Sequence, residues 1–321
     1  MSDEPDPARK IIPIEDLRRE ARARRERDPF AGDPDAGDPD ADPASFAEPD
    51  EADFAPEARP EPPAPGLWDR VGDVHPGFTY GLVLAILIGF AAQLVTATAP
   101  AGSIVAGGSL AGPFVTAGAA LRGPFLAGEW WRAFAPIFLH ANLLHLGSNL
   151  LALAIVGGVV ERAFGHARFL VLFTVAALAG SLATFEHQRL VEVAGGFGTL
   201  GSIGASGAVY GVGAAVVAAA IRLRGLLSPW RARALIGATL PLLLSSLAGG
   251  FARPGTDNAA HLGGAVAGAV LGFVLPLHGE LQRGKEPGPA RALWAAAGLV
   301  GLSALVASGI LAFQHGMAAG R

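Results

Sequence analysis

The chain has 321 residues, of which 51% are hydrophobic and 16% are charged, and its formal net charge is −4. A soluble core this apolar would leave too few polar residues to cover the surface, so the composition predicts a membrane protein. The acidic balance disfavours a nucleic-acid partner, and a sequence without cysteine excludes disulfides, thiol catalysis and cysteine-ligated metal sites.

Residues 1–75 differ from the rest of the chain. They combine an arginine-rich run, RREARARRER (18–27), with a long stretch rich in proline and aspartate. So little apolar surface does not offset the entropy lost on ordering, and we expect a disordered cytoplasmic tail. The basic run also suits a short helix on anionic lipid, although a solvated tail is the simpler interpretation. No cleavable signal peptide is expected.

Seven apolar segments follow this tail. About 20 apolar residues cross ~30 Å of hydrocarbon as a helix, so the segments predict an all-α polytopic membrane protein. We expect these helices at residues 78–98, 138–160, 167–184, 203–221, 233–248, 259–277 and 292–313. The fifth is the shortest. The sequence thus divides into a tail (1–75), a membrane core (76–280), and a linker with a seventh helix (281–321).

A long connection, residues 99–133, joins the first two expected helices. It is apolar and runs into the sequence GEWWRAFAP (128–136). Loops of this length are usually functional or disordered, and tryptophan is typical of the membrane–water interface. We therefore expect this first loop to lie in the interface.

The loop charges predict the orientation, because Lys and Arg accumulate on the cytoplasmic side. With the N-terminus inside, the cytoplasmic ends of the helices hold nine basic residues and the external segments hold five. The nine are Arg162, Arg168, Arg222, Arg224, Arg231, Arg233, Arg283, Lys285 and Arg291, and the five are Arg122, Arg132, Arg189, Arg253 and Arg321. We expect a cytoplasmic N-terminus and an external C-terminus.

Polar side chains inside the expected helices point to function, because such groups are costly in a bilayer. The second helix carries His140, His145 and Asn149, and the last two share one face at a spacing of four residues. Ser206 opens the fourth helix, and His261 lies near the start of the sixth.

These residues form a complete set for acyl transfer. Ser206 needs an adjacent base to act as a nucleophile, and His261 is suited to that role near neutral pH. The side chains of His145 and Asn149 and the backbone N–H of Ser206 would stabilise a developing oxyanion. The sequence therefore favours a serine hydrolase inside the membrane.

Small residues explain how the fourth and sixth helices come together. Glycines recur every four residues in both helices, at Gly207 and Gly211 in the fourth and at Gly264, Gly268 and Gly272 in the sixth. This spacing lets two backbones approach closely, and Gly204 is expected to belong to the same packing surface. His261 lies on the same face as Gly264 and Gly268, so it would face the helix that carries Ser206.

Other chemistries fit these residues less well. A metal site on the second helix would have no carboxylate or thiolate, and asparagine is a poor transition-metal ligand. Plain hydrogen bonding between helices stays an alternative for the same groups. The sequence GASGA is not the G-x-S-x-G elbow of soluble hydrolases because residue 208 is alanine, and no G-K-[ST] follows for phosphate binding.

Four motifs resemble the rhomboid intramembrane serine proteases, over about residues 128–273. They are WR (131–132), HANLLHLGSN (140–149), GASG (204–207) and AHLGGAVAG (260–268). The resemblance implies a six-helix core, with the C-terminal helix as an addition, and a cavity open to the external side.

The same resemblance implies roles for individual residues. Ser206 and His261 would form a dyad without an acidic third member, and His145, Asn149 and the Ser206 amide would form the oxyanion site. The remaining roles concern support: His140 at the mouth of the site, Tyr210 packed on the catalytic imidazole, and Glu161 supporting the first loop beside Trp131 and Arg132.

The implied activity is cleavage of single-span transmembrane proteins near the external membrane boundary, with no cofactor and no bound metal. Partners are then the substrates and the bilayer; the sequence predicts no oligomeric state. A non-catalytic relative that binds transmembrane clients is an alternative, but such proteins typically lack a dyad residue. A transporter or proton channel would need paired carboxylates in the helices and inverted repeats. The composition, rich in Ala, Gly and Arg, favours a bacterial inner membrane.

Overall fold

The computed structural model describes residues 74–97, 112–196, 201–224, 227, 229–253, 255–277 and 288–319. These residues belong to one compact unit, Pro63–Arg321, and they contain no β-strand. Nearly all of the expected tail, part of the first loop and most of the linker before the seventh helix lie outside the described residues.

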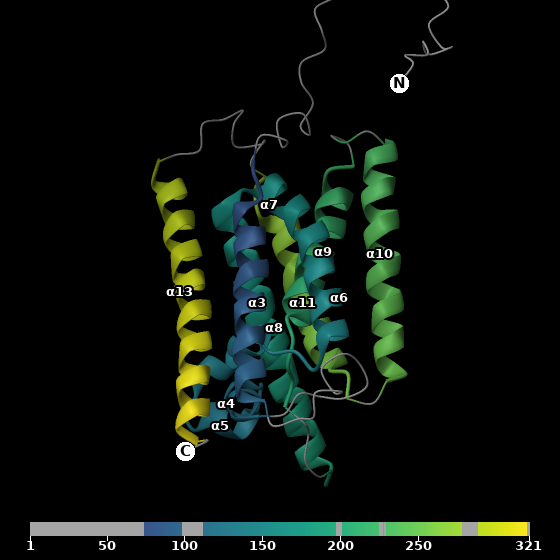
Figure 1. Cartoon of the computed structure of the whole chain (residues 1–321). Coiled ribbons are helices and arrows are strands. Elements are labelled where there is room, and N and C mark those ends of the chain that lie inside the picture. Colours follow the sequence, from purple (N-terminus) through teal and green to yellow (C-terminus); the bar gives the residue numbers. More distant parts are fainter. Residues whose placement is uncertain are drawn as a thin grey trace, which may run out of the picture. The chain divides into compact units, whose positions relative to one another are not determined.

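The described residues form seven long helical segments that run side by side (Figure 1). They are α3 (Gly77–Thr96), α6 (Leu143–Ala152) continued through the π-helical turn η6 (Leu153–Gly157) into α7 (Gly158–Phe164), α8 (His166–Val193), α9 (Ser206–Arg222), α10 (Pro229–Phe251), α11 (Asn258–Val274) and α13 (Gly288–Ala319). This arrangement confirms the all-α polytopic fold.

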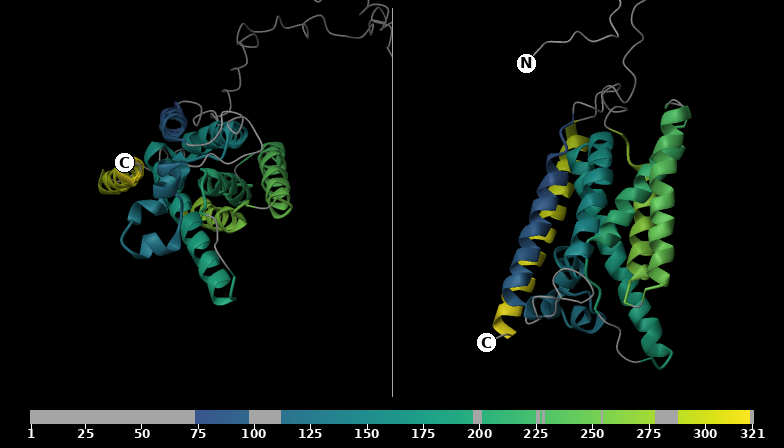
Figure 2. Two further views of the ribbon diagram at one scale, coloured as in Figure 1. Left: turned by 60° about the horizontal axis from the view of Figure 1, so that its bottom comes forward. Right: turned by 45° about the vertical axis from the view of Figure 1, so that its right-hand side comes forward.

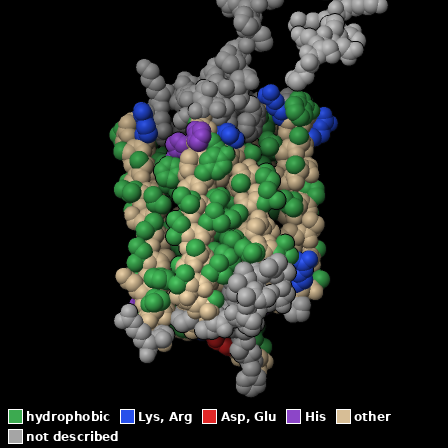
Figure 3. All heavy atoms as spheres, in the orientation of Figure 1, with side chains coloured by type: hydrophobic (Ala, Val, Ile, Leu, Met, Phe, Trp, Pro, Cys, Tyr) green, Lys and Arg blue, Asp and Glu red, His purple; other side chains and the backbone are tan. Residues whose placement is uncertain are grey.

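Five of these segments are long and apolar enough to cross a membrane, with α6, η6 and α7 counted as one. The other two, α9 and α11, have 17 residues each. Such a helix rises about 25 Å, which is less than the ~30 Å of a bilayer's hydrocarbon core. Apolar side chains cover the face seen in Figure 3, and the visible charged side chains gather toward the helix ends.

The central helix is α9, which packs against α11, α8, α10 and η6. Most of its residues are buried, and α13 and α10 lie at opposite sides of the bundle (Figure 2, left). Glycines bring α9 and α11 together. A Cβ on Gly264 would collide with the carbonyl of Gly207, and one on Gly268 would collide with that of Gly211.

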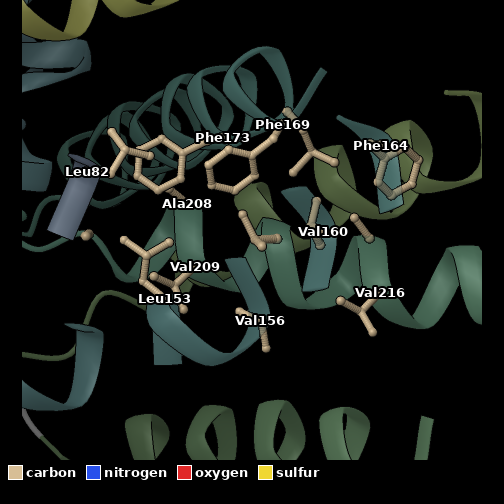
Figure 4. Packing of buried hydrophobic residues seen from close by; sticks show 14 of the residues in the cluster. Leu82, Leu153, Val156, Val160, Phe164, Phe169, Phe173, Ala208, Val209 and Val216 are labelled. Carbon is tan, nitrogen blue, oxygen red and sulfur yellow. The ribbon is translucent and has the colours of Figure 1, made fainter. Parts of the chain in front are cut away.

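A hydrophobic core fills the space between α9, α8 and the segment from η6 to α7. Phenylalanine side chains of α8 meet small and branched side chains of the other helices (Figure 4). The labelled members are Leu82, Leu153, Val156, Val160, Phe164, Phe169, Phe173, Ala208, Val209 and Val216. This core fixes the position of α9, and with it that of Ser206 at its first residue.

Three helices are longer than expected. The seventh was expected at 292–313, whereas α13 covers Gly288–Ala319. The third helix was expected to end at residue 184, yet α8 continues to Val193 and protrudes at the lower end in Figure 2, right. The fifth was expected to be the shortest, at 233–248, whereas α10 has 23 residues with Pro241 inside it. Only α10's central part is continuously apolar, so hydropathy underestimates its length.

The role expected for Glu161 is wrong. This buried carboxylate makes no hydrogen bond to the described part of the first loop. It accepts hydrogen bonds from the backbone N–H groups of Phe78 and Thr79 (2.9 and 2.7 Å) and from the Thr79 hydroxyl (2.7 Å). It also lies 2.6 Å from Nδ1 of His166. The first N–H groups of a helix have no intrahelical partner, so Glu161 caps α3 from a different helix, at the end of the bundle opposite α4 and α5 (Figure 1).

Candidate active site

Ser206 and His261 lie in hydrogen-bond contact. Ser206 is the first residue of α9 and His261 lies in the first turns of α11. The distance between Oγ of Ser206 and Nε2 of His261 is 2.9 Å. The glycine contact between Gly207 and Gly264 is directly beside this pair, so the close packing of α9 on α11 sets the distance. This geometry suits transfer of the hydroxyl proton to the imidazole.

The imidazole of His261 is held on its other sides as well. Its Nδ1 lies 3.2 Å from Oδ1 of Asn258, and the Tyr210 ring stacks on it with centroids 4.2 Å apart and planes 9° apart. When Nδ1–H donates to Asn258, Nε2 carries the lone pair that accepts from Ser206. Sequence reasoning missed Asn258, although its position three residues before His261 on one helix face is a usable signal.

Gly204 shapes the opposite wall of the site. Its φ is +120°, and a Cβ built there would lie 2.7 and 2.8 Å from Cε1 and Nε2 of His145 and 3.5 Å from Nδ2 of Asn149. The expectation that Gly204 packs helices together is therefore wrong, because it precedes α9 and makes room for the His145 ring.

The side chains of His145 and Asn149 both have an N–H group near Gly204 that can donate a hydrogen bond. Nδ1 of His145 accepts a hydrogen bond from the Ala141 N–H (3.3 Å), which leaves Nε2 to carry the proton. Nδ2 of Asn149 is buried and has no hydrogen-bond partner among the described residues. Ser206 adds its own backbone N–H, which, as the first of a helix, has no intrahelical acceptor.

His140 lies deeper than expected. The resemblance implies a place at the mouth of the site, but the side chain is fully buried (0% exposed). Gln93 of α3 holds its backbone: the Gln93 amide donates to the His140 carbonyl (2.7 Å) and accepts from the His140 N–H (2.9 Å). Its ring centroid lies 5.0 Å from that of His145, so His140 supports the ring of His145 from behind.

The described part of the first loop is folded into short helices: α4 (Pro113–Gly118), α5 (Arg122–Leu126) and the 3₁₀ turns η4 (Trp130–Ala133) and η5 (Ala135–Phe138). Two side chains hold it together. Trp131 donates from Nε1 to the Ala117 carbonyl (3.0 Å), and Arg132 donates to the carbonyls of Thr116 and Ala119 (2.8 and 3.0 Å).

This loop is bonded to the segment that leads to Ser206. Ala120 and Ser202 exchange two backbone hydrogen bonds (2.9 and 3.3 Å), and the Gly204 N–H donates to the Pro136 carbonyl (2.8 Å). The loop thereby fixes the approach of the chain to the site. The helix α13 adds a contact that the sequence did not predict: the His315 ring packs on Trp131, with ring centroids 4.4 Å apart and the planes tilted by 30°.

Comparison with protein families matches residues 127–277 to the Rhomboid domain. The chain therefore contains a region similar to the Rhomboid domain, which spans just under half of its length. The matched region contains the Ser206–His261 pair, the His145–Asn149 face and the Trp131–Arg132 turn, whereas α3 and α13 lie outside it. Together with the apolar helices, this domain match identifies the chain as an integral membrane protein.

Several curated relatives are similar to the rhomboid domain. Rhomboid protease GluP of Bacillus subtilis (strain 168) is 35% identical over 150 residues, which are 47% of this chain and 27% of the relative. RHOMBOID-like protein 5 of Arabidopsis thaliana is 36% identical over 155 residues, 47% of this chain and 45% of the relative. Rhomboid protease AarA of Providencia stuartii is 31% identical over 167 residues, 46% of this chain and 56% of the relative. The chain spans well under two thirds of these relatives, which come from plants as well as bacteria.

Proposed function

We propose that this chain is an intramembrane serine endopeptidase that uses Ser206 as nucleophile and His261 as general base. The observation that carries the proposal is the 2.9 Å contact between Oγ of Ser206 and Nε2 of His261. Two relatives bear the name rhomboid protease, which supports the same reaction class. The substrates we propose are single-span membrane proteins, cut near the external boundary of the membrane.

The first half of the reaction forms an acyl-enzyme. Ser206 Oγ attacks the scissile carbonyl carbon while its proton passes to Nε2 of His261. The imidazolium then gives this proton to the leaving amine, and the C–N bond breaks. Asn258, by accepting from Nδ1, keeps the ring in the tautomer that this step requires.

The oxyanion forms beside three N–H groups: Nε2 of His145, Nδ2 of Asn149 and the Ser206 amide. The last lies at the N-terminal end of α9, where the aligned peptide dipoles favour negative charge. In the second half, His261 takes a proton from water, the hydroxide attacks the acyl carbon, and the proton returns to Ser206 as the acyl group leaves.

The test is cleavage of a panel of single-span proteins by the purified chain in liposomes. Ser206→Ala should abolish cleavage and labelling by a fluorophosphonate, since no other described hydroxyl contacts His261. His261→Ala should lower both by roughly 10³-fold or more, because the serine loses its base. Undiminished cleavage by Ser206→Ala would reject the proposal. A chain that binds substrates without cleaving or labelling would instead match a non-catalytic relative.

A further inference from the structure

One carboxylate fixes the start of α11 to α8. Asp257 directly precedes α11, and its Oδ1 accepts a hydrogen bond from the Ala260 N–H (3.0 Å), which caps the helix. Its Oδ2 accepts a short hydrogen bond from the hydroxyl of Thr184, a buried residue of α8. Asp257 thus joins the helix that carries His261 to a helix of the hydrophobic core.

The backbones around this bond are too close for the start of α11 to move alone. A Cβ on Gly180 of α8 would lie 3.1 Å from the Ala260 carbonyl oxygen, and one on Gly207 of α9 would lie 3.2 Å from the same atom. A Cβ on Gly263 would lie 2.6 Å from the Ala179 carbonyl oxygen. Three helices therefore meet at Ala260, between Asp257 and His261, and the hydrogen bond to Thr184 adds to the packing that holds His261 beside Ser206.

Asp257 also brings a negative charge near a base that has no carboxylate partner. Among the described residues, the hydrogen-bond partners of the His261 ring are the neutral side chains of Ser206 and Asn258. Asp257 lies one helical turn before His261, whose backbone N–H donates to the Asp257 carbonyl (3.4 Å). The His145 ring, on α6, lies on the other side of the site at Gly204. From α9, Tyr210 stacks on the ring. Asp257 thus places a negative charge one helical turn before the imidazolium that would form during proton transfer.

We propose that Asp257 is a positioning residue for the reaction: its carboxylate holds the first turn of α11 on α8 through Thr184 and places a negative charge one turn before His261. The inference rests on the proposed function, because it assigns Asp257 to the same site. Nothing in the hydrogen-bond pattern requires Asp257 to touch the substrate.

Two substitutions separate the hydrogen bond from the charge. Asp257→Asn removes the charge, yet its amide oxygen still suits the Ala260 N–H and its NH₂ suits the Thr184 oxygen. Thr184→Val removes the hydroxyl and leaves the charge, and Thr184→Ser restores a hydroxyl. The controls are Thr174→Val, a buried α8 threonine without a hydrogen-bond partner among the described residues, and Glu186→Gln, which neutralises an exposed carboxylate of α8.

The measurements are kcat, KM and the pH profile of kcat in liposomes, with fluorophosphonate labelling used to count active molecules. Asp257→Asn should lower kcat about tenfold and move the acid limb of the profile about half a unit or more toward lower pH, because a nearby negative charge favours the protonated base. Thr184→Val should lower kcat about fivefold with the acid limb unmoved. Thr184→Ser should recover wild-type kcat, and KM should stay within about twofold throughout.

Wild-type kcat and an unmoved acid limb in both Asp257→Asn and Thr184→Val would overturn the inference, as would losses confined to the yield of folded protein. Failure of the proposed function would appear differently, as cleavage that survives Ser206→Ala. In that case thermal unfolding still tests whether Asp257 and Thr184 form a stabilising hydrogen bond between α11 and α8. The losses in Tm from Thr184→Val and Asp257→Ala should be less than additive in the double variant, and strict additivity would contradict a bond between them.

Discussion

Gly204 is the residue at which the backbone and the proposed oxyanion site depend on each other most directly. Its φ of +120° lies in a region that side chains disfavour, and its Cα faces the His145 ring. Its N–H donates a hydrogen bond to the Pro136 carbonyl, so the first loop holds the glycine in this conformation.

Gly204→Ala should therefore lower kcat by roughly tenfold or more, because the added methyl group displaces the His145 ring as well as straining the backbone. Cleavage in liposomes measures this loss. Gly195→Ala is the matched control, since Gly195 has φ +77° but nothing within 4 Å of its Cβ position. It should change stability alone, and an equal loss of kcat in both variants would refute the role of the contact.

At the scale of single residues, the sequence reveals candidate site residues whose side chains are unusual for the helix that carries them. Ser206 and His261 stand out because a hydroxyl and an imidazole are unusual inside apolar helices, and the structure brings them together. The hydrogen-bond partners of Glu161, by contrast, could not be predicted from the sequence. They are backbone N–H groups about 80 residues away, and no spacing in the sequence indicates such a contact.

The pairing of α9 with α11 is the element-level feature on which the proposed dyad rests. The Gly264 Cα faces the Gly207 carbonyl so closely that any side chain must separate the helices. Since backbone groups on both sides are held by their own helical hydrogen bonds, neither helix yields locally.

Gly264→Ala should lower the free energy of unfolding by about 1–3 kcal/mol, as overpacking does elsewhere, and should abolish cleavage by moving His261 away from Ser206. Thermal unfolding in detergent and fluorophosphonate labelling measure the two effects. Gly147→Ala on α6 serves as control, because nothing lies within 4 Å of its Cβ position. Wild-type labelling by Gly264→Ala would contradict the packing argument.

Helix existence was predictable from apolar length, whereas helix ends were not. The run Glu186–Arg189 lowers hydropathy after residue 184, yet α8 continues because Glu186 and Arg189 pair along the helix (2.5 Å). Gln188 bonds to the backbone of Ala120 and Arg122 (2.9 and 2.8 Å). Tertiary bonds to the first loop thus stabilise a polar turn that a membrane segment alone would not include.

For the whole molecule, the distribution of basic residues predicts a cytoplasmic N-terminus and an external C-terminus. The chain has no cysteine, so single-cysteine variants report on one position each. In intact cells, a membrane-impermeant maleimide should label Gln314→Cys, near the external end of α13, and should not label Gly288→Cys at its other end. The opposite labelling pattern would reverse the orientation. Lysed cells, in which both variants should react, provide the control.

The cap that Glu161 places on α3 has a consequence for where this protein can be divided. The recognised domain starts at residue 127, but its own carboxylate is saturated by N–H groups that lie before that boundary. An excised 127–277 fragment would lose the backbone donors of Phe78 and Thr79 and the Thr79 hydroxyl, and this buried carboxylate would keep its contact with His166. We therefore expect the stably folded unit to include α3 and to be larger than the matched domain.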